Sequence, residues 1–227
     1  MKLLGLIGGT SWHSTEVYYR LINEKVGSII GTDSNPPLLM YSMNIQLMRS
    51  GDRESINAEY LRVARMLEQA GAEAIIICAN TPHMVYTYVQ PKISIPILHI
   101  AHAVGQQASR VGLKRLGLLG NRPTMTKGFI QHYLDEHFGI SVSTLPEKFV
   151  ERSHQYISKE LTQGIFSDDA RDFYLCQICR FKEKGMDGVI LGCTELPILL
   201  EKEAAELPMI ETTQLHAQMA VDFILSD

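Results

Sequence analysis

Short apolar runs rich in Ile, Val and Leu alternate along the chain with longer amphipathic stretches. We expect strands at Leu3–Ile7, Leu38–Ser42, Ala74–Cys78, Ile97–His99, Leu116–Leu119, Val142–Thr144 and Gly188–Leu191. Helices are expected at Ser14–Val26, Ser55–Ala70, Ala101–Val111, Thr126–Phe138, Glu151–Gln163, Asp168–Lys184 and Thr213–Leu225. Because the strands are nearly continuous apolar runs and alternate with helices, the pattern predicts an α/β fold with parallel sheets covered on both faces.

Two pairs of segments repeat within the chain. Lys2–Gly9 resembles Lys114–Asn121, displaced by 112 positions, and Gly71–Asn80 resembles Gly185–Thr194, displaced by 114. Each of the four segments contains a buried strand that ends in a turn of small or polar residues. Chance similarity between buried strands is the alternative, but two nearly equal displacements favour two copies of one α/β unit.

The repeat predicts two α/β halves. The first comprises residues 1–98 and 208–227, and the second comprises residues 99–207. We expect the last helix to pack on the first half, because it carries an apolar stripe of Leu215, Met219, Val221 and Ile224.

Four turns mark the expected site. In open α/β sheets, ligands bind beyond the carboxyl ends of the strands. The turns there are Gly8–Trp12, Cys78–His83, Gly120–Thr124 and Gly192–Glu195. If the halves face each other, these turns converge on one cleft, with Ala79 and Cys193 in equivalent places.

The bulk composition excludes several classes of protein. The chain has 227 residues, with 45% hydrophobic and 20% charged, as in ordinary globular proteins. A net charge of -4 argues against a nucleic-acid-binding surface. No apolar stretch approaches the roughly 20 residues that span a membrane, and no signal-peptide cleavage site follows the first apolar run, so we expect a cytoplasmic protein.

The four cysteines do not predict a metal site. Cys176 and Cys179 form a C-x-x-C pair, which can indicate redox or zinc chemistry. The pair lies in a stretch where apolar residues recur at helical spacing, so we interpret it as two positions on a helix face. A second C-x-x-C or a histidine pair to complete a zinc site is missing from the sequence.

The first glycine turn has features of an anion site. Gly8–Thr15 follows a strand and opens a helix, and its glycines allow a ligand to approach the backbone. Thr10, Ser11 and Ser14 add hydroxyls. Without a full dinucleotide or phosphate-loop motif, a small carboxylate fits better than a nucleotide, and a capped turn without a ligand is the alternative.

Two further turns carry candidate chemistry. Cys193 ends a buried strand before a helix, where the helix dipole favours thiolate; an inert core cysteine is the alternative. Asn80 and Thr81 have short polar side chains that suit an ammonium or carboxylate group. His83 can move protons near neutral pH, although an ordinary loop histidine is the alternative.

Together these segments resemble the aspartate/glutamate racemase family. The resemblance is carried by Gly8–Thr15, by Asn80-Thr81-x-His83 and by Gly192-Cys193-Thr194-Glu195, in the family's order and spacing. It implies two flavodoxin-like, or Rossmann-like, halves related by a pseudo-two-fold duplication, with the active site between them. It also implies a homodimer that binds an amino acid or dicarboxylate and needs neither pyridoxal cofactor nor metal.

The resemblance also implies a mechanism. Two facing residues exchange the α-proton of an amino acid, one on each face, and Cys193 matches one of them. Asn80, Thr81, Thr124 and Thr194 match positions that hold the amino and carboxylate groups, and Thr10, Ser11 and Glu195 are further expected site residues. Arg152 is expected to bind a distal carboxylate, with Arg49 and Arg53 as alternatives.

Ala79 departs from the family pattern. The first catalytic residue belongs immediately before Asn80, and a methyl group there cannot move a proton. Cys78 is one residue early, so its side chain points to the opposite face of the strand. His83 is a candidate substitute. The alternatives are an enzyme using one thiol, such as a decarboxylase, and a catalytically silent amino-acid-binding protein.

Overall fold

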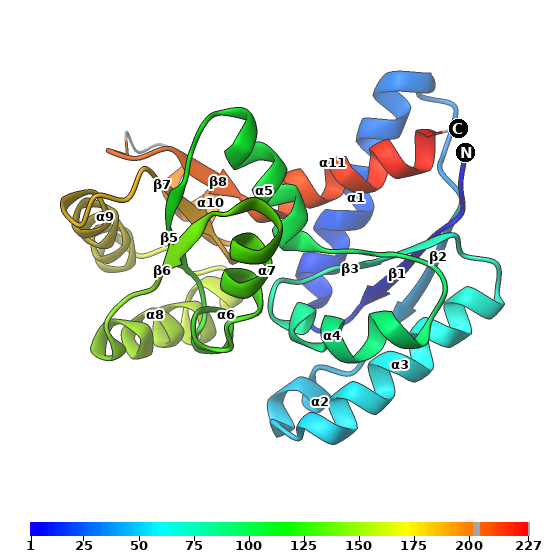
Figure 1. Ribbon diagram of the computed structural model, residues 1–227, viewed down its shortest axis with the longest axis horizontal. Coiled ribbons are helices and arrows are strands. Elements are labelled where there is room, and N and C mark those ends of the chain that lie inside the picture. Colours follow the sequence, from blue (N-terminus) through cyan, green and yellow to red (C-terminus); the bar gives the residue numbers. More distant parts are fainter. Residues whose placement is uncertain (202–204, 227) are drawn as a thin grey trace. The chain divides into compact units, whose positions relative to one another are not determined.

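The computed structural model describes residues 1–201 and 205–226, and the chain divides into two compact units (Figure 1). Unit 1 comprises Met1–Ile100 and Thr213–Asp227, and unit 2 comprises Ala101–Thr212. Each unit contains helices and one parallel sheet. The domain boundaries expected from the sequence, after Leu98 and after Leu207, stay a prediction.

Within the described residues, unit 1 has a four-stranded parallel sheet in the order β2-β1-β3-β4. Its strands are β1 (Leu4–Gly8), β2 (Leu38–Ser42), β3 (Ala74–Ile77) and β4 (Ile97–Leu98). Its helices are α1 (Trp12–Ile30), α2 (Ile45–Ser50), α3 (Arg53–Gln69), η1 (Thr81–Val85), α4 (Tyr86–Val89), η2 (Gln90–Lys92) and α11 (Thr212–Leu225).

Alternating side chains on the central strands of unit 1 build a core on each face of the sheet. Leu6 of β1 and Ile76 of β3 pack with buried residues of α1 and α11. Ile7 and Ile77, one position later on each strand, pack instead with α3 and α4. Figure 1 shows the two helical layers on opposite sides of this sheet. Two-sided burial explains why these strands are apolar throughout.

The described part of unit 2 also has a four-stranded parallel sheet, in the order β6-β5-β7-β8. Its strands are β5 (Arg115–Leu119), β6 (Ser141–Ser143), β7 (Gly188–Leu191) and β8 (Met209–Glu211). Its helices are α5 (Ile100–Arg110), α6 (Arg122–Thr126), α7 (Phe129–Phe138), α8 (Glu147–Lys159), η3 (Leu161–Gln163), α9 (Asp168–Glu183) and α10 (Leu196–Leu200).

The two sheets share one connectivity and one register. In unit 1, Ile7 pairs with Ile77, and in unit 2, Leu119 pairs with Leu191. The next residue closes each strand end in the same way: Cys78 N–H donates to Ile7 O at 2.9 Å, and Gly192 N–H donates to Leu119 O at 2.8 Å. The α/β fold built from two repeated parallel-sheet units is therefore confirmed.

Four details correct the expectations from sequence. The three-residue strand β8 was not expected from the sequence. The expected helix Thr126–Phe138 is two helices, α6 and α7, and the helix expected from Glu151 begins at Glu147 and ends at Lys159. Both members of the C-x-x-C pair lie on the helix α9 as expected, but Cys176 is exposed, so it is not part of the buried apolar face of that helix.

The apolar stripe of α11 lies differently from the one expected. His216, Ala217, Ala220, Val221 and Ile224 are buried in unit 1, whereas Leu215 and Met219 are only half-buried. The helix packs on unit 1 as expected, through the core that it shares with β1 and α1. Its small alanines allow close approach to neighbouring elements, so its buried stripe includes both large and small side chains.

In the described part of the chain, no helix is both long enough and apolar enough to cross a membrane.

Candidate functional site

The turn after β1 is held together by its own hydroxyls. Ser11 caps α1, its Oγ accepting from Ser14 N at 3.3 Å, and Gly9 N–H donates to Thr15 Oγ1 at 2.9 Å. Thr10 Oγ1 lies 2.8 Å from the hydroxyl of Tyr60, a residue outside the expected site. These groups are already engaged before any ligand binds.

Gly9 has a structural reason to be glycine. Its φ is 84°, and an added β-carbon would lie only 2.1 Å from the carbonyl oxygen of Met43. Glycine is therefore required here because the chain that follows β2 lies close against the backbone of Gly9. Contacts within the protein account for glycine at this position, and the approach of a ligand to the turn stays a prediction.

The turn after β3 contains Ala79, Asn80 and Thr81. Cys78 is 1% exposed and belongs to the core shared with α1 and α11, where burial raises the pKa of its thiol. Ala79 is half-buried and Asn80 is buried. The buried Ser14 hydroxyl donates to Cys78 O at 2.7 Å, so α1 fixes the end of β3.

His83 lies beneath this turn, in the core of unit 1. Its side chain is fully buried, and Nδ1 lies 2.9 Å from Ala79 O and 3.2 Å from Asn80 O. Burial lowers the pKa of His83 to about 4, against smaller opposing effects of the carbonyls. A histidine that moves protons at neutral pH needs access to substrate and a pKa nearer 7, so these contacts favour a supporting role.

The turn after β7 contains the candidate thiol. Cys193 is partly exposed, and its Sγ–H donates to Glu195 Oε2 at 2.8 Å. Thr194 Oγ1 donates to the same carboxylate oxygen at 2.8 Å, and Glu195 is buried. The structure therefore brings these three predicted site residues together around one carboxylate.

Cys193 is electrostatically different from the expectation. Burial raises the pKa of its thiol well above the ordinary value, and the charge and hydrogen bond of Glu195 raise it further. The N–H groups of Thr194 and Glu195 act in the opposite direction but are weaker. Burial first, and the Glu195 carboxylate second, therefore favour the protonated thiol in this conformation over the thiolate expected from the sequence.

Thr124 is a buried neighbour of the Cys193 turn. It follows β5 in α6, where its N–H donates to the capping Asn121 at 2.9 Å. Its Cγ2 would lie 3.2 Å from a β-carbon added at either Gly120 or Gly192. Thr124 is fully buried, so its side chain packs beneath the two turns of unit 2.

The candidate arginines have different surroundings. Arg152 extends over the rings of Tyr156 and Phe173, at 5.4 and 5.2 Å, and donates to the Tyr156 hydroxyl at 2.9 Å. Arg53 starts α3, and its Nη2 lies 3.4 Å from Met84 O in η1, the helix that follows the Asn80 turn. Arg49 is exposed on α2. Of the three, Arg53 alone makes a described contact with an element carrying predicted site residues.

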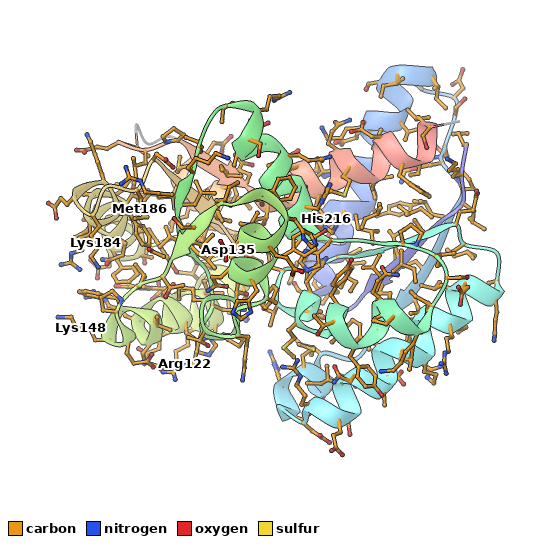
Figure 2. The ribbon with its side chains drawn as sticks, in the orientation of Figure 1. Arg122, Asp135, Lys148, Lys184, Met186 and His216 are labelled. Atoms are coloured by element: carbon orange, nitrogen blue, oxygen red, sulfur yellow. The ribbon has the colours of Figure 1, made fainter. Side chains whose placement is uncertain are left out.

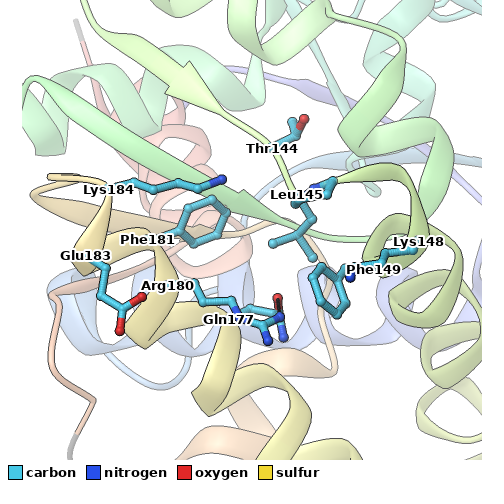
Figure 3. Close-up of a pocket in the computed structure, with 10 residues that line it drawn as sticks. Thr144, Leu145, Lys148, Phe149, Gln177, Arg180, Phe181, Glu183 and Lys184 are labelled. Atoms are coloured by element: carbon cyan, nitrogen blue, oxygen red, sulfur yellow. Dashed lines mark hydrogen bonds between the residues drawn. The ribbon is translucent and has the colours of Figure 1, made fainter.

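A separate pocket of about 320 Å³ lies in unit 2 (Figure 3). Leu145, Phe149 and Phe181 form its apolar wall, and Lys148, Arg180 and Lys184 surround it. The Arg180 guanidinium lies 4.3 Å from the Phe149 ring centroid. None of the predicted site residues lines this pocket.

Among the described residues, no group of three or more His, Cys, Asp or Glu side chains has the arrangement of a metal site.

Comparisons with known proteins identify the family. The sequence profile described as Asp/Glu/Hydantoin racemase matches residues 7–220. The chain belongs to this racemase family. A candidate Asp/Glu racemase of known structure from Yersinia pestis is 38% identical to it, with all of both chains covered and a TM-score of 0.93.

More distant racemases also match. The broad-specificity amino-acid racemase of Bacillus subtilis is 21% identical, over 99% of this chain and 99% of its own length. The glutamate racemase of Francisella tularensis, solved in complex with D-glutamate, shares the fold at 19% identity and a TM-score of 0.69, covering 98% of this chain and 80% of its own. The chain is thus of the Asp/Glu amino-acid racemase type, a family of isomerases.

Proposed function

We propose that this protein acts on the α-carbon of an acidic amino acid, aspartate or glutamate, with Cys193 as its acid/base residue. The observation that carries the proposal is the hydrogen bond from the Cys193 thiol to the Glu195 carboxylate at the end of β7. Family membership supports the reaction type, and the D-glutamate bound to the Francisella relative supports the class of substrate.

The Cys193–Glu195 pair can move a proton without creating net charge. With its raised pKa the thiol is protonated at rest. Transfer of its proton to the Glu195 carboxylate leaves a thiolate and a neutral acid, and the thiolate then accepts the substrate's α-proton. Returning a proton from the same thiol regenerates the starting enantiomer. If the thiol proton exchanges with deuterated solvent between the two transfers, deuterium is placed on the α-carbon.

Racemisation requires a second acid/base group for the opposite face of the substrate. The shared register makes Ala79 the counterpart of Cys193, because each is the second residue after a paired strand end. The methyl group of Ala79 cannot accept or donate a proton. We therefore expect exchange of the α-proton of one enantiomer, with slow racemisation.

Recognition of the substrate would use the polar groups of the strand-end turns. We propose Asn80, Thr81 and Thr194 for the amino and α-carboxylate groups. Arg53 is the better-supported partner for a distal carboxylate, because it reaches η1, whereas Arg152 is engaged with aromatic rings. An arginine suits this task because its fixed donors match a carboxylate.

The test is incubation of the protein with each enantiomer of aspartate and glutamate in deuterated water. NMR measures loss of the α-proton, and chiral chromatography measures conversion between enantiomers. We expect deuterium incorporation with retention for one enantiomer. Absence of incorporation for all four compounds would reject the proposal.

Ala79 also favours two other functions within this scaffold. A one-thiol decarboxylase would release carbon dioxide while protonating one face, and a silent binding protein would show a thermal shift with ligand but no exchange. The same incubation separates these functions from the proposed one, provided that carbon dioxide and the melting temperature are also measured.

A further inference from the structure

Three histidines form a buried cluster in unit 1. His83 comes from η1, His99 follows β4, and His216 lies on α11, labelled in Figure 2. Their side chains are at most 3% exposed. The ring centroid of His83 lies 4.9 Å from that of His99 and 5.2 Å from that of His216. Segments far apart in sequence therefore meet beneath the turn that contains Ala79 and Asn80.

The hydrogen bonds of His216 define its tautomer. Its Nε2 lies 2.6 Å from Leu98 O, and a carbonyl can only accept, so Nε2 carries the proton. Its Nδ1 then accepts from the Tyr18 hydroxyl at 2.8 Å. Burial raises the pKa of Tyr18 well above its ordinary value, so the phenol keeps its proton. His216 is neutral and is held at both ring nitrogens.

The same reasoning assigns the proton of His83 to Nδ1. The nearest partners of Nδ1 are the carbonyl oxygens of Ala79 and Asn80, which both accept. Nε2 is buried and makes no well-aligned hydrogen bond within the described structure, as suits the lone pair of a neutral ring, although the Leu98 carbonyl also acts on the ring. A charged imidazole here would lie against two other imidazoles in an apolar core.

This hydrogen bond completes the backbone of the turn. In an α-helix, the N–H of His83 would donate to Ala79 O, four residues earlier. The chain instead forms the tighter 3₁₀ turn, and His83 N–H donates to Asn80 O at 3.1 Å. The imidazole supplies a donor to the Ala79 carbonyl that the α-helical bond would otherwise have satisfied. An unpaired carbonyl at this depth would be costly.

We propose that His83 is a positioning residue: its neutral Nδ1–H holds the carbonyls of Ala79 and Asn80 and thereby fixes the turn that presents Asn80 and Thr81 to the substrate. Packing against His99 and His216 holds the ring in this orientation. The role rests on the proposed function for its link to the substrate, but the hydrogen bond itself does not depend on it. Proton transfer stays with Cys193.

The second unit contains no such ring at the matching place. The shared register pairs His83 with Pro197, and the Cys193 carbonyl accepts from Leu196 N at 3.3 Å. Glu195 instead binds the side chains of that turn. The histidine is therefore a feature of the turn in unit 1 and not of the repeated scaffold.

Two substitutions distinguish positioning from a general need for a ring. His83→Asn keeps an N–H donor near the place of Nδ1, whereas His83→Gln moves the donor toward the place of Nε2. We expect His83→Gln to weaken binding of the preferred amino acid about tenfold, the equivalent of one lost hydrogen bond. His83→Asn should retain most of the affinity. The exposed His132→Gln is the matched control.

The kinetic readout separates positioning from catalysis. With His83→Gln, α-proton exchange should show a raised KM and the wild-type pH profile. Loss of one limb of that profile would instead make His83 an acid or base and would overturn the proposal. Equal losses of affinity in His83→Asn and His83→Gln would also overturn it.

Two measurements on the unliganded protein test the hydrogen bond without substrate. Nitrogen-15 NMR of labelled histidine should show His83 protonated at Nδ1, and amide hydrogen exchange at Asn80 and Thr81 should accelerate about tenfold in His83→Gln. A ring protonated only at Nε2 would contradict the proposal even if the variants fail to fold. If the wild type binds no amino acid but shows the Nδ1 proton, the proposed function is rejected, whereas the hydrogen bonding of His83 to the turn is supported.

Discussion

The turns after β3 and β7 share a backbone but differ in chemistry. Each follows a strand paired in the same register, and each begins with an N–H donated to the end of the neighbouring strand. In unit 2 the turn carries a thiol and a carboxylate in contact. In unit 1 the matching positions are Ala79 and Thr81, and the titratable side chains next to the turn, Cys78 and His83, are both buried.

Under the proposed function, the duplicated scaffold divides its tasks between the two turns. The register fixes where side chains project, because it is set by backbone hydrogen bonds and two-sided burial. The side chains themselves then decide whether a turn does chemistry or holds shape. We assign proton transfer to the turn of unit 2 and a binding role to the turn of unit 1.

The largest expected effect is loss of the thiol from unit 2. Cys193→Ala should lower the rate of α-proton exchange by 10²- to 10⁴-fold, roughly the contribution of a positioned acid/base. NMR in deuterated water measures the rate. Cys176→Ala, which removes an exposed thiol from the same unit, is the control and should leave it unchanged. If exchange continues in Cys193→Ala, proton transfer does not depend on the turn of unit 2, and the proposed difference between the two turns is wrong.

A second effect concerns stability in acid and arises in unit 1. Because the folded-state pKa of His83 is about 4 and its unfolded value is about 6.5, the unfolded chain binds a proton first as the pH falls. The contribution is fully present above pH 6.5 and is lost progressively toward pH 4. At about 1.4 kcal/mol for each pH unit, the loss is about 3 kcal/mol.

Chemical denaturation of wild type and His83→Asn at several pH values measures this loss. Asn cannot titrate, so the variant should have the shallower slope between pH 6.5 and 4. His216 shares the effect, since its pKa is also lowered. The rings around His83 are His99 and His216, which in turn contact Tyr86 and Tyr18. Parallel slopes for the two proteins would show that His83 is not buried in neutral form.

A smaller effect is expected for the carboxylate in unit 2. Glu195→Gln removes the charge that helps to raise the pKa of Cys193, so the thiol should react with iodoacetamide at lower pH. The same change removes the proton acceptor, so exchange should slow about tenfold. Alkylation is measured with Cys176 and Cys179 replaced by alanine, and Glu206→Gln is the control. Faster alkylation together with faster exchange would show that Glu195 only restrains the thiol.

Much of the fold follows from local pattern. Apolar runs of Ile and Val locate the central strands, and the displacements of 112 and 114 residues relate the two units. Short elements give a weaker signal: the sequence indicated β4 and β6 but not β8 or α10. β8 has three residues and α10 has five, so neither extends over enough positions to show a period. On α11, the buried face includes alanines and a hydrogen-bonded histidine, so it could not be identified from the large apolar residues alone.

The sequence locates the strand-end turns but not the electrostatics of their side chains. The repeat and the family resemblance select Ala79 and Cys193, but the pKa of Cys193 depends on where the Glu195 side chain turns. The environment of His83 depends on His216, which is 133 positions away in sequence. Tyr60 meets Thr10 only because α3 packs on β1. Such contacts are products of tertiary packing.

We propose that the turn of unit 1 is the silent counterpart of the turn of unit 2. Its most direct test compares wild type with Ala79→Cys in deuterated water, following both enantiomers of aspartate and glutamate. We expect exchange with retention in the wild type and a racemisation rate higher by roughly 10²- to 10⁴-fold in the variant. Fast racemisation by the wild type, or no gain in a folded Ala79→Cys, would contradict it.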